Sequence, residues 1–214
     1  MRTAYLLIAA IVLAGCWLGP LPRAAEHSFT AHMMLHTAVV AVAAPFVALG
    51  IARTAVDPVR TIARIVAPIP ASMIELVIVW TWHAPALHRA ARVEPALFVL
   101  EQASFLFGGV WLWIAAVGGT NEQRRRRAGA GVAALLFTSM HMTLLGALFA
   151  LADRPLFGHA MPEVAASPVS DQQTGGVIML LVGGSAYLIG ALWLTRLALD
   201  PRSHAACPVE EQAT

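Results

Sequence analysis

Residues 29–50 read FTAHMMLHTAVVAVAAPFVALG, and this stretch decides the fold class. Its 22 residues include no Asp, Glu, Lys or Arg. As a helix rising about 1.5 Å per residue it would extend about 33 Å, enough to cross the hydrocarbon core of a bilayer. The stretch therefore predicts a transmembrane helix that carries His32 and His36. Pro45 is expected to distort this helix, because it cannot donate a backbone hydrogen bond.

Five further stretches have the same apolar character. Hydrophobic residues make up 58% of the 214 residues and charged residues only 12%, and the mean hydropathy is +0.71. A soluble domain of this length could not bury so much apolar surface in one core. Alternating strand patterns are absent, which favours helices. The predicted fold is an all-α polytopic transmembrane bundle of about six helices, over residues 4–21, 29–50, 65–82, 96–117, 132–151 and 174–194.

The first apolar stretch has two interpretations. Residues 1–22 form either a first transmembrane helix or a lipoprotein-type signal, because Leu13-Ala14-Gly15-Cys16 resembles a cleavage site before Cys16. Cleavage would leave five spans instead of six. Residues 23–199 are expected to form the bundle, and residues 200–214 a flexible cytoplasmic tail.

Arginine asymmetry orients the predicted bundle. With the N-terminus inside, ten arginines fall in inner segments and four in outer loops; the ten are Arg2, Arg53, Arg60, Arg64, Arg124, Arg125, Arg126, Arg127, Arg196 and Arg202. Because positive residues favour the cytoplasmic side, we expect a multi-pass membrane protein whose arginine-rich segments face the cytoplasm. Both termini are cytoplasmic if the first span is retained. The run from Arg124 to Arg127 then anchors the topology, and nucleic acid is not an expected partner.

Polar side chains within the apolar stretches gather in the outer half of this bundle. His32 and His36 share one helix face, because four residues make about one turn. With the expected topology, the same half receives His83, Glu75, Glu101, His141, Asp171, Gln172 and Gln173. Ionisable groups inside a membrane are rare and mark candidate functional sites.

The chemistry of these side chains favours copper over zinc. Imidazole suits copper in either oxidation state, and thioether sulfur selects Cu(I). Met33, Met34, Met140 and Met142 accompany the histidines, although Met140 and Met142 are about 200° apart around a helix and cannot both face one site. Zinc would gain little from methionine.

Structural roles remain open for the same residues. A neutral histidine that hydrogen-bonds across helices would account for His36 or His141. His32 could reach lipid headgroups, and His83 and His88 flank a loop where both could be solvated. The signatures of nucleotide-binding proteins and common hydrolases are absent, so no catalytic turnover is expected.

Several motifs, taken in order and spacing, resemble the CtaG-type cytochrome c oxidase assembly factors. They are HMMLH at 32–36 followed by AP at 44–45, WHAPAL at 82–87, EQASFL at 101–106, HM at 141–142 leading to RPLF at 154–157, and DQQTGGVIM at 171–179. The resemblance covers residues 29–195. It implies a polytopic bacterial plasma-membrane protein that supports maturation of haem-copper oxidases, with copper as the implied cargo.

Carried over to this sequence, the resemblance implies metal-site positions at His32, His36, His83, Glu101, His141, Asp171 and Gln172. Many relatives carry histidine where this chain has Gln102, so no ligand is expected there. Oxidase subunits, membrane lipid and a periplasmic copper chaperone are the implied partners. Three alternatives are a haem-binding protein with His36 and His141 as axial ligands, a metal transporter, and a structural oxidase subunit. A transporter would carry ionisable groups through the inner half as well, and the inner half has almost none.

Overall fold

The computed structural model describes residues 1–157 and 167–199, and the described chain is almost entirely helical. The predicted tail at 200–214 lies outside the described residues. In chain order the elements are α1 (Arg2–Leu18), α2 (Leu21–His27), α3 (Phe29–Thr37), η1 (Ala38–Ala43), α4 (Ala44–Ile51), α5 (Val59–Ile62), α6 (Pro68–Trp82), α7 (Pro85–Val93), α8 (Pro95–Val117), α9 (Asn121–Ala150), α10 (Pro168–Ile178), η2 (Met179–Gly184) and α11 (Ser185–Leu199).

The predicted all-α polytopic class is confirmed. Four helical stretches are long and apolar enough to cross a membrane: Phe29–Ile51, Pro95–Val117, Asn121–Ala150 and Pro168–Leu199. A fifth candidate is the pair α1 and α2, which bend by 49° at their junction. The remaining predicted span corresponds to α6, an apolar helix of 15 residues. At about 1.5 Å per residue it extends only about 22 Å.

Two predicted helix starts are too late in the sequence. The helix expected from residue 132 begins at Asn121, where Thr120 and Gln123 form a reciprocal capping box. Arg124 to Arg127 therefore belong to the first turns of α9. The helix expected from residue 174 begins at Pro168, and Ser167 caps it by accepting the Ser170 N–H. In both cases a polar cap places the start upstream of the apolar run.

The distortion expected at Pro45 takes the form of a π-helical segment. η1 spans Ala38–Ala43 and directly precedes the turn that contains Pro45, while Phe29–Ile51 continues as one helical stretch. A second π segment, η2, joins α10 to α11. Such segments re-space side chains along a helix and are frequent near functional sites.

Small residues bring the helices into backbone contact. A Cβ added to Gly146 of α9 would lie 2.7 Å from the Leu180 nitrogen and 2.8 Å from the Gly176 oxygen. A Cβ on Gly176 of α10 would lie 2.5 Å from the Ala150 nitrogen. These positions need glycine because the atoms opposite are backbone and cannot move aside.

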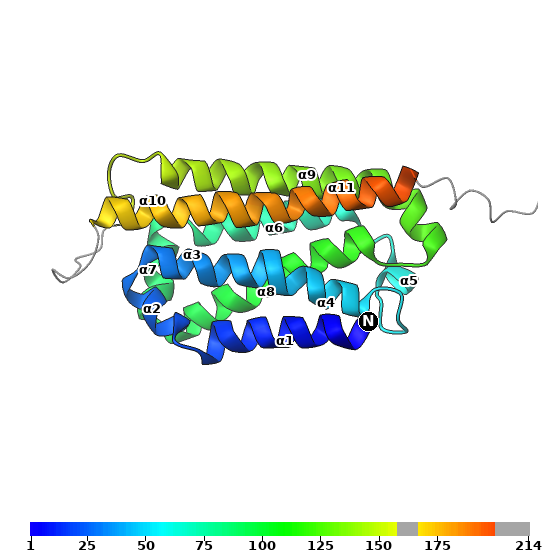
Figure 1. The fold of residues 1–214 in the computed structure, drawn as a ribbon, viewed down its shortest axis with the longest axis horizontal. Coiled ribbons are helices and arrows are strands. Elements are labelled where there is room, and N and C mark those ends of the chain that lie inside the picture. Colours follow the sequence, from blue (N-terminus) through cyan, green and yellow to red (C-terminus); the bar gives the residue numbers. More distant parts are fainter. Residues whose placement is uncertain (158–166, 200–214) are drawn as a thin grey trace, which may run out of the picture.

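The long helices run between the two ends of the bundle, so that successive connections lie at alternate ends (Figure 1). One end holds α2, α7 and the starts of α3 and α10, and the other holds the N-terminus and the end of α11. At the latter end buried Asp57 ties two loops together, because its Oδ2 accepts the Arg53 and Gly119 N–H groups at 2.6 and 2.7 Å. His32 of α3 and His88 of α7 lie towards the end that holds α2 and α7.

Candidate metal centre

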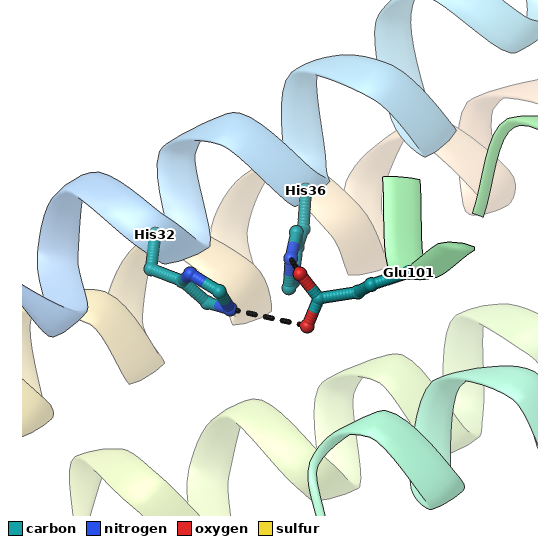
Figure 2. A group of neighbouring side chains, drawn as sticks. All are labelled: His32, His36 and Glu101. Atoms are coloured by element: carbon teal, nitrogen blue, oxygen red, sulfur yellow. Dashed lines mark ion pairs between the residues drawn. The ribbon is translucent and has the colours of Figure 1, made fainter. Parts of the chain in front are cut away.

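Three buried side chains converge between α3 and α8. His32 and His36 project from α3 towards Glu101 of α8, as Figure 2 shows. His32 Nε2 lies 3.4 Å from Glu101 Oε1, and His36 Nε2 lies 3.1 Å from Glu101 Oε2. One ligand atom from each residue lies within 4.8 Å of the other two. Relative exposures are 1%, 4% and 0%, so the group is enclosed by protein.

The spacing of the three side chains suits a shared ion. In a tetrahedral site with bonds of about 2.0–2.1 Å, neighbouring ligand atoms are ~3.3 Å apart. The nitrogen–oxygen distances here bracket that value. His32 Nε2, His36 Nε2 and Glu101 Oε1 are buried, and apart from one another they have no hydrogen-bond partner among the described residues. Buried polar atoms are normally hydrogen-bonded, so three such atoms facing one another constitute a candidate ligand set.

Two further side chains orient Glu101. Gln102 Nε2 donates to Glu101 Oε2 at 3.3 Å, and Trp17 Nε1 of α1 donates to Gln102 Oε1 at 3.4 Å. Outer-shell hydrogen bonds of this kind fix the direction of a ligand. Gln102, the position where the chain departs from the family pattern, thus contacts the candidate ligand instead of joining it.

Two more histidines extend the group into a row. The His88 ring of α7 lies 4.6 Å from the His32 ring, and the His83 ring lies 5.8 Å from the His36 ring. The solvated positions considered for His83 and His88 are wrong: their exposures are 6% and 0%. Burial lowers the pKa of His83 to about 4, and it also holds the pKa of His88 below its usual range. Both rings are neutral near pH 7.

A cavity leads from the surface to His32. Its volume is about 270 Å³, and its lining includes Glu26 of α2, Arg92 of α7, Phe98 of α8 and His32 itself. Arg92 donates to the Glu26 carbonyl at 2.7 Å and lies 3.4 Å from His88 Nε2. Of the three residues of the group, His32 therefore borders a cavity at the end of the bundle that carries α2 and α7.

Asp171 holds the start of α3. Its Oδ1 accepts the Ser28 hydroxyl at 2.9 Å and the Thr30 N–H at 3.1 Å, and its Oδ2 accepts the Phe29 N–H at 2.6 Å. Free N–H groups at a helix start favour an anion. Asp171 thereby joins α10 to the helix that carries His32 and His36, and it lies outside the group of three.

Gln172 and His141 also lie outside this group. Gln172 is buried, accepts the Leu156 N–H at 2.8 Å and donates to the Arg154 carbonyl, so it fastens the segment after α9. His141 is 3% exposed, and its ring contacts that of Phe137 at 5.7 Å. Both of its ring nitrogens are buried without a hydrogen-bond partner among the described residues.

Sequence reasoning missed His88 as a neighbour of His32. The residue lies in α7, a nine-residue helix that begins at Pro85 and is too short to span a membrane. The available signal was the amphipathic pattern of residues 85–93, which predicts a helix lying against the bundle with one buried face. His88 and Ala91 form that face.

Comparison with known proteins identifies one family. The family model described as cytochrome c oxidase caa3 assembly factor (Caa3_CtaG) matches residues 1–199. Neither a curated protein nor a solved structure matches the chain.

Proposed function

Because the chain belongs to the family of cytochrome c oxidase caa3 assembly factors, we propose that it binds copper and supplies it to a haem-copper oxidase. It holds the ion at His32, His36 and Glu101 and turns over no substrate. The observation that carries this proposal is the convergence of three buried ligand atoms within 4.8 Å.

Charge and donor type both favour copper as cargo. Two neutral imidazoles and one carboxylate carry a charge of −1, so a monovalent cation makes the site neutral. Neutrality matters because an uncompensated charge in low-dielectric surroundings is costly. Imidazole accepts copper in both oxidation states. The group of His32, His36 and Glu101 contains no thiolate, which also suits a donor that must release its ion.

The arginine asymmetry supports a periplasmic position for this site. His32 would then exchange copper with the periplasm through the cavity beside Arg92. The partners are an oxidase subunit as acceptor and a periplasmic copper chaperone as donor. Lipid of the bacterial plasma membrane surrounds the apolar helices.

Metal binding by the detergent-purified protein tests the site directly. Loss of an outer-shell partner weakens metal binding by about 10- to 100-fold. His36→Ala and Glu101→Gln remove proposed ligands and are expected to weaken copper binding by more than that. His27→Ala is the matched control, since the His27 side chain is 77% exposed. Unchanged copper affinity in both folded site variants would reject these ligands. A haem absorption spectrum that depends on His36 and His141 would favour the haem-binding alternative.

Deletion of the protein in cells tests its role. Oxidase polypeptides and haem are expected to remain, while active enzyme falls because copper centres are incomplete. Added copper should restore part of the activity, since mass action loads a site without its delivery protein. Fully copper-loaded oxidase in the deletion strain, without a redundant factor, would contradict copper supply. Co-purification with mature oxidase at one-to-one ratio would instead favour a structural subunit.

A further inference from the structure

A small cavity lies beside His36, and its lining differs from that of the cavity that reaches His32. Its volume is about 10 Å³, and its lining includes His36, His83, Phe105 and three methionines, Met33, Met142 and Met179. The methionines come from α3, α9 and η2. About one water-sized body fits such a space, so a bare metal ion fits and a porphyrin does not.

The methionines of this chain divide into those that line the cavity and those that do not. Met33, Met142 and Met179 are 1–3% exposed, whereas Met34 is 46% and Met140 is 60% exposed. A Cβ on Gly183 would lie 3.0 Å from Met142 Cε and 4.0 Å from Met179 Cγ, so both side chains approach the same side of η2. Three methionine side chains from separate helical segments thus line one cavity.

Two histidine nitrogens distinguish this cavity from ordinary packing of methionines in a core. His83 Nδ1 lies 2.6 Å from the Val79 carbonyl, which can only accept, so Nδ1 donates and Nε2 carries the lone pair. That Nε2 is buried without a hydrogen-bond partner among the described residues, and so is His36 Nδ1. A buried nitrogen without a hydrogen bond destabilises the fold, because it has lost its contact with water. Beside thioethers, the same nitrogen can serve as a metal ligand.

We propose that this cavity is a second position for Cu(I), with His83, Met142, Met33 and Met179 as ligands. His36 can add Nδ1 only while the first site is empty, because a neutral imidazole has one lone pair. The inference rests on the proposed copper function and specifies the oxidation state. Imidazole and thioether are neutral ligands, so a divalent ion would bring two uncompensated charges into apolar surroundings. Thioether sulfur also selects Cu(I) over Cu(II) and Zn(II).

The test uses purified full-length protein, with Cu(I) under reducing conditions and a competing chelator, and Ag(I) as a redox-inert soft probe. Met142→Leu and Met179→Leu keep side-chain size and remove sulfur. Each is expected to weaken Cu(I) and Ag(I) binding at least tenfold while leaving Zn(II) binding unchanged. Met140→Leu and Met34→Leu are the matched controls and should have no effect. X-ray absorption of the Cu(I) form should show sulfur ligands that the double variant lacks.

The outcomes separate this inference from the proposed function. If Glu101→Gln abolishes copper binding and the methionine variants bind normally without copper–sulfur scattering, the second position is wrong and the first site stands. If only the methionine variants lose Cu(I), the second position stands and the ligand set with Glu101 is wrong. Normal binding in every variant overturns both.

Discussion

Asp171 and Glu101 are both acidic residues of the same half of the bundle, yet their surroundings assign them different tasks. Glu101 Oε1 is buried, and apart from the candidate ligand His32 it has no hydrogen-bond partner among the described residues. Both oxygens of Asp171 accept hydrogen bonds from the start of α3. A carboxylate whose lone pairs are engaged by N–H and O–H donors has less to offer a metal. Asp171 therefore acts as a positioning residue.

Replacement of Asp171 by Asn tests this assignment. The amide nitrogen cannot accept the Phe29 N–H. We therefore expect the free energy of unfolding to fall by about 0.5–2 kcal/mol, which is typical of a lost helix cap. Thermal unfolding in detergent measures the change, and copper affinity should stay within a few-fold of the parent. Asp153→Asn is the matched control because Asp153 is exposed. Loss of copper binding at unchanged thermal stability would instead make Asp171 a ligand.

Among the elements, the contact between α9 and α10 sets how the bundle closes around the site. α9 carries Met142, and α10 carries Asp171, which holds α3. Gly146 and Gly176 permit the close approach of the two helices. A change at this contact therefore reaches the site without touching a candidate ligand.

Gly146→Ala is expected to destabilise the protein by about 1–3 kcal/mol, the usual cost of overpacking. The added methyl would meet the Leu180 nitrogen and the Gly176 oxygen, which are backbone atoms. Gly129→Ala in the same helix is the control, because nothing lies within 4 Å of its Cβ position. That variant should be neutral or more stable by about 0.5–1 kcal/mol. Equal unfolding midpoints for the two variants would contradict a close helix contact.

For the whole molecule, the orientation in the membrane decides which compartment the site faces. Single cysteines at Asn121 and Asp153, in a background with Cys16 and Cys207 replaced by Ser, report it through a membrane-impermeant maleimide. We expect labelling at Asp153 in intact cells and at Asn121 only after lysis, because arginine-rich segments stay cytoplasmic. The reverse pattern would place the candidate site on the cytoplasmic side and exclude exchange with the periplasm.

Local sequence was enough to predict the helical class, the six apolar segments and the shared face of His32 and His36. Each depends on composition or on the 3.6-residue period, which neighbouring residues determine by themselves. Helix starts were predicted less well, because the caps at Thr120 and Ser167 precede the apolar runs. An apolar pattern marks the segment that lipid favours, and the helix extends beyond it.

The resemblance grouped seven candidate positions, and only the tertiary structure showed that His32, His36 and Glu101 are the three that converge. Periodicity places His36, Glu101 and His141 on faces of their own helices, but it cannot say how each helix is rotated against its neighbours. The packing of the helices sets that rotation, so Glu101 faces His32 and His36. Met142, rather than Met140, faces the cavity beside His36. Burial of His88 likewise depends on α7 folding back onto α3, a contact between residues more than fifty positions apart.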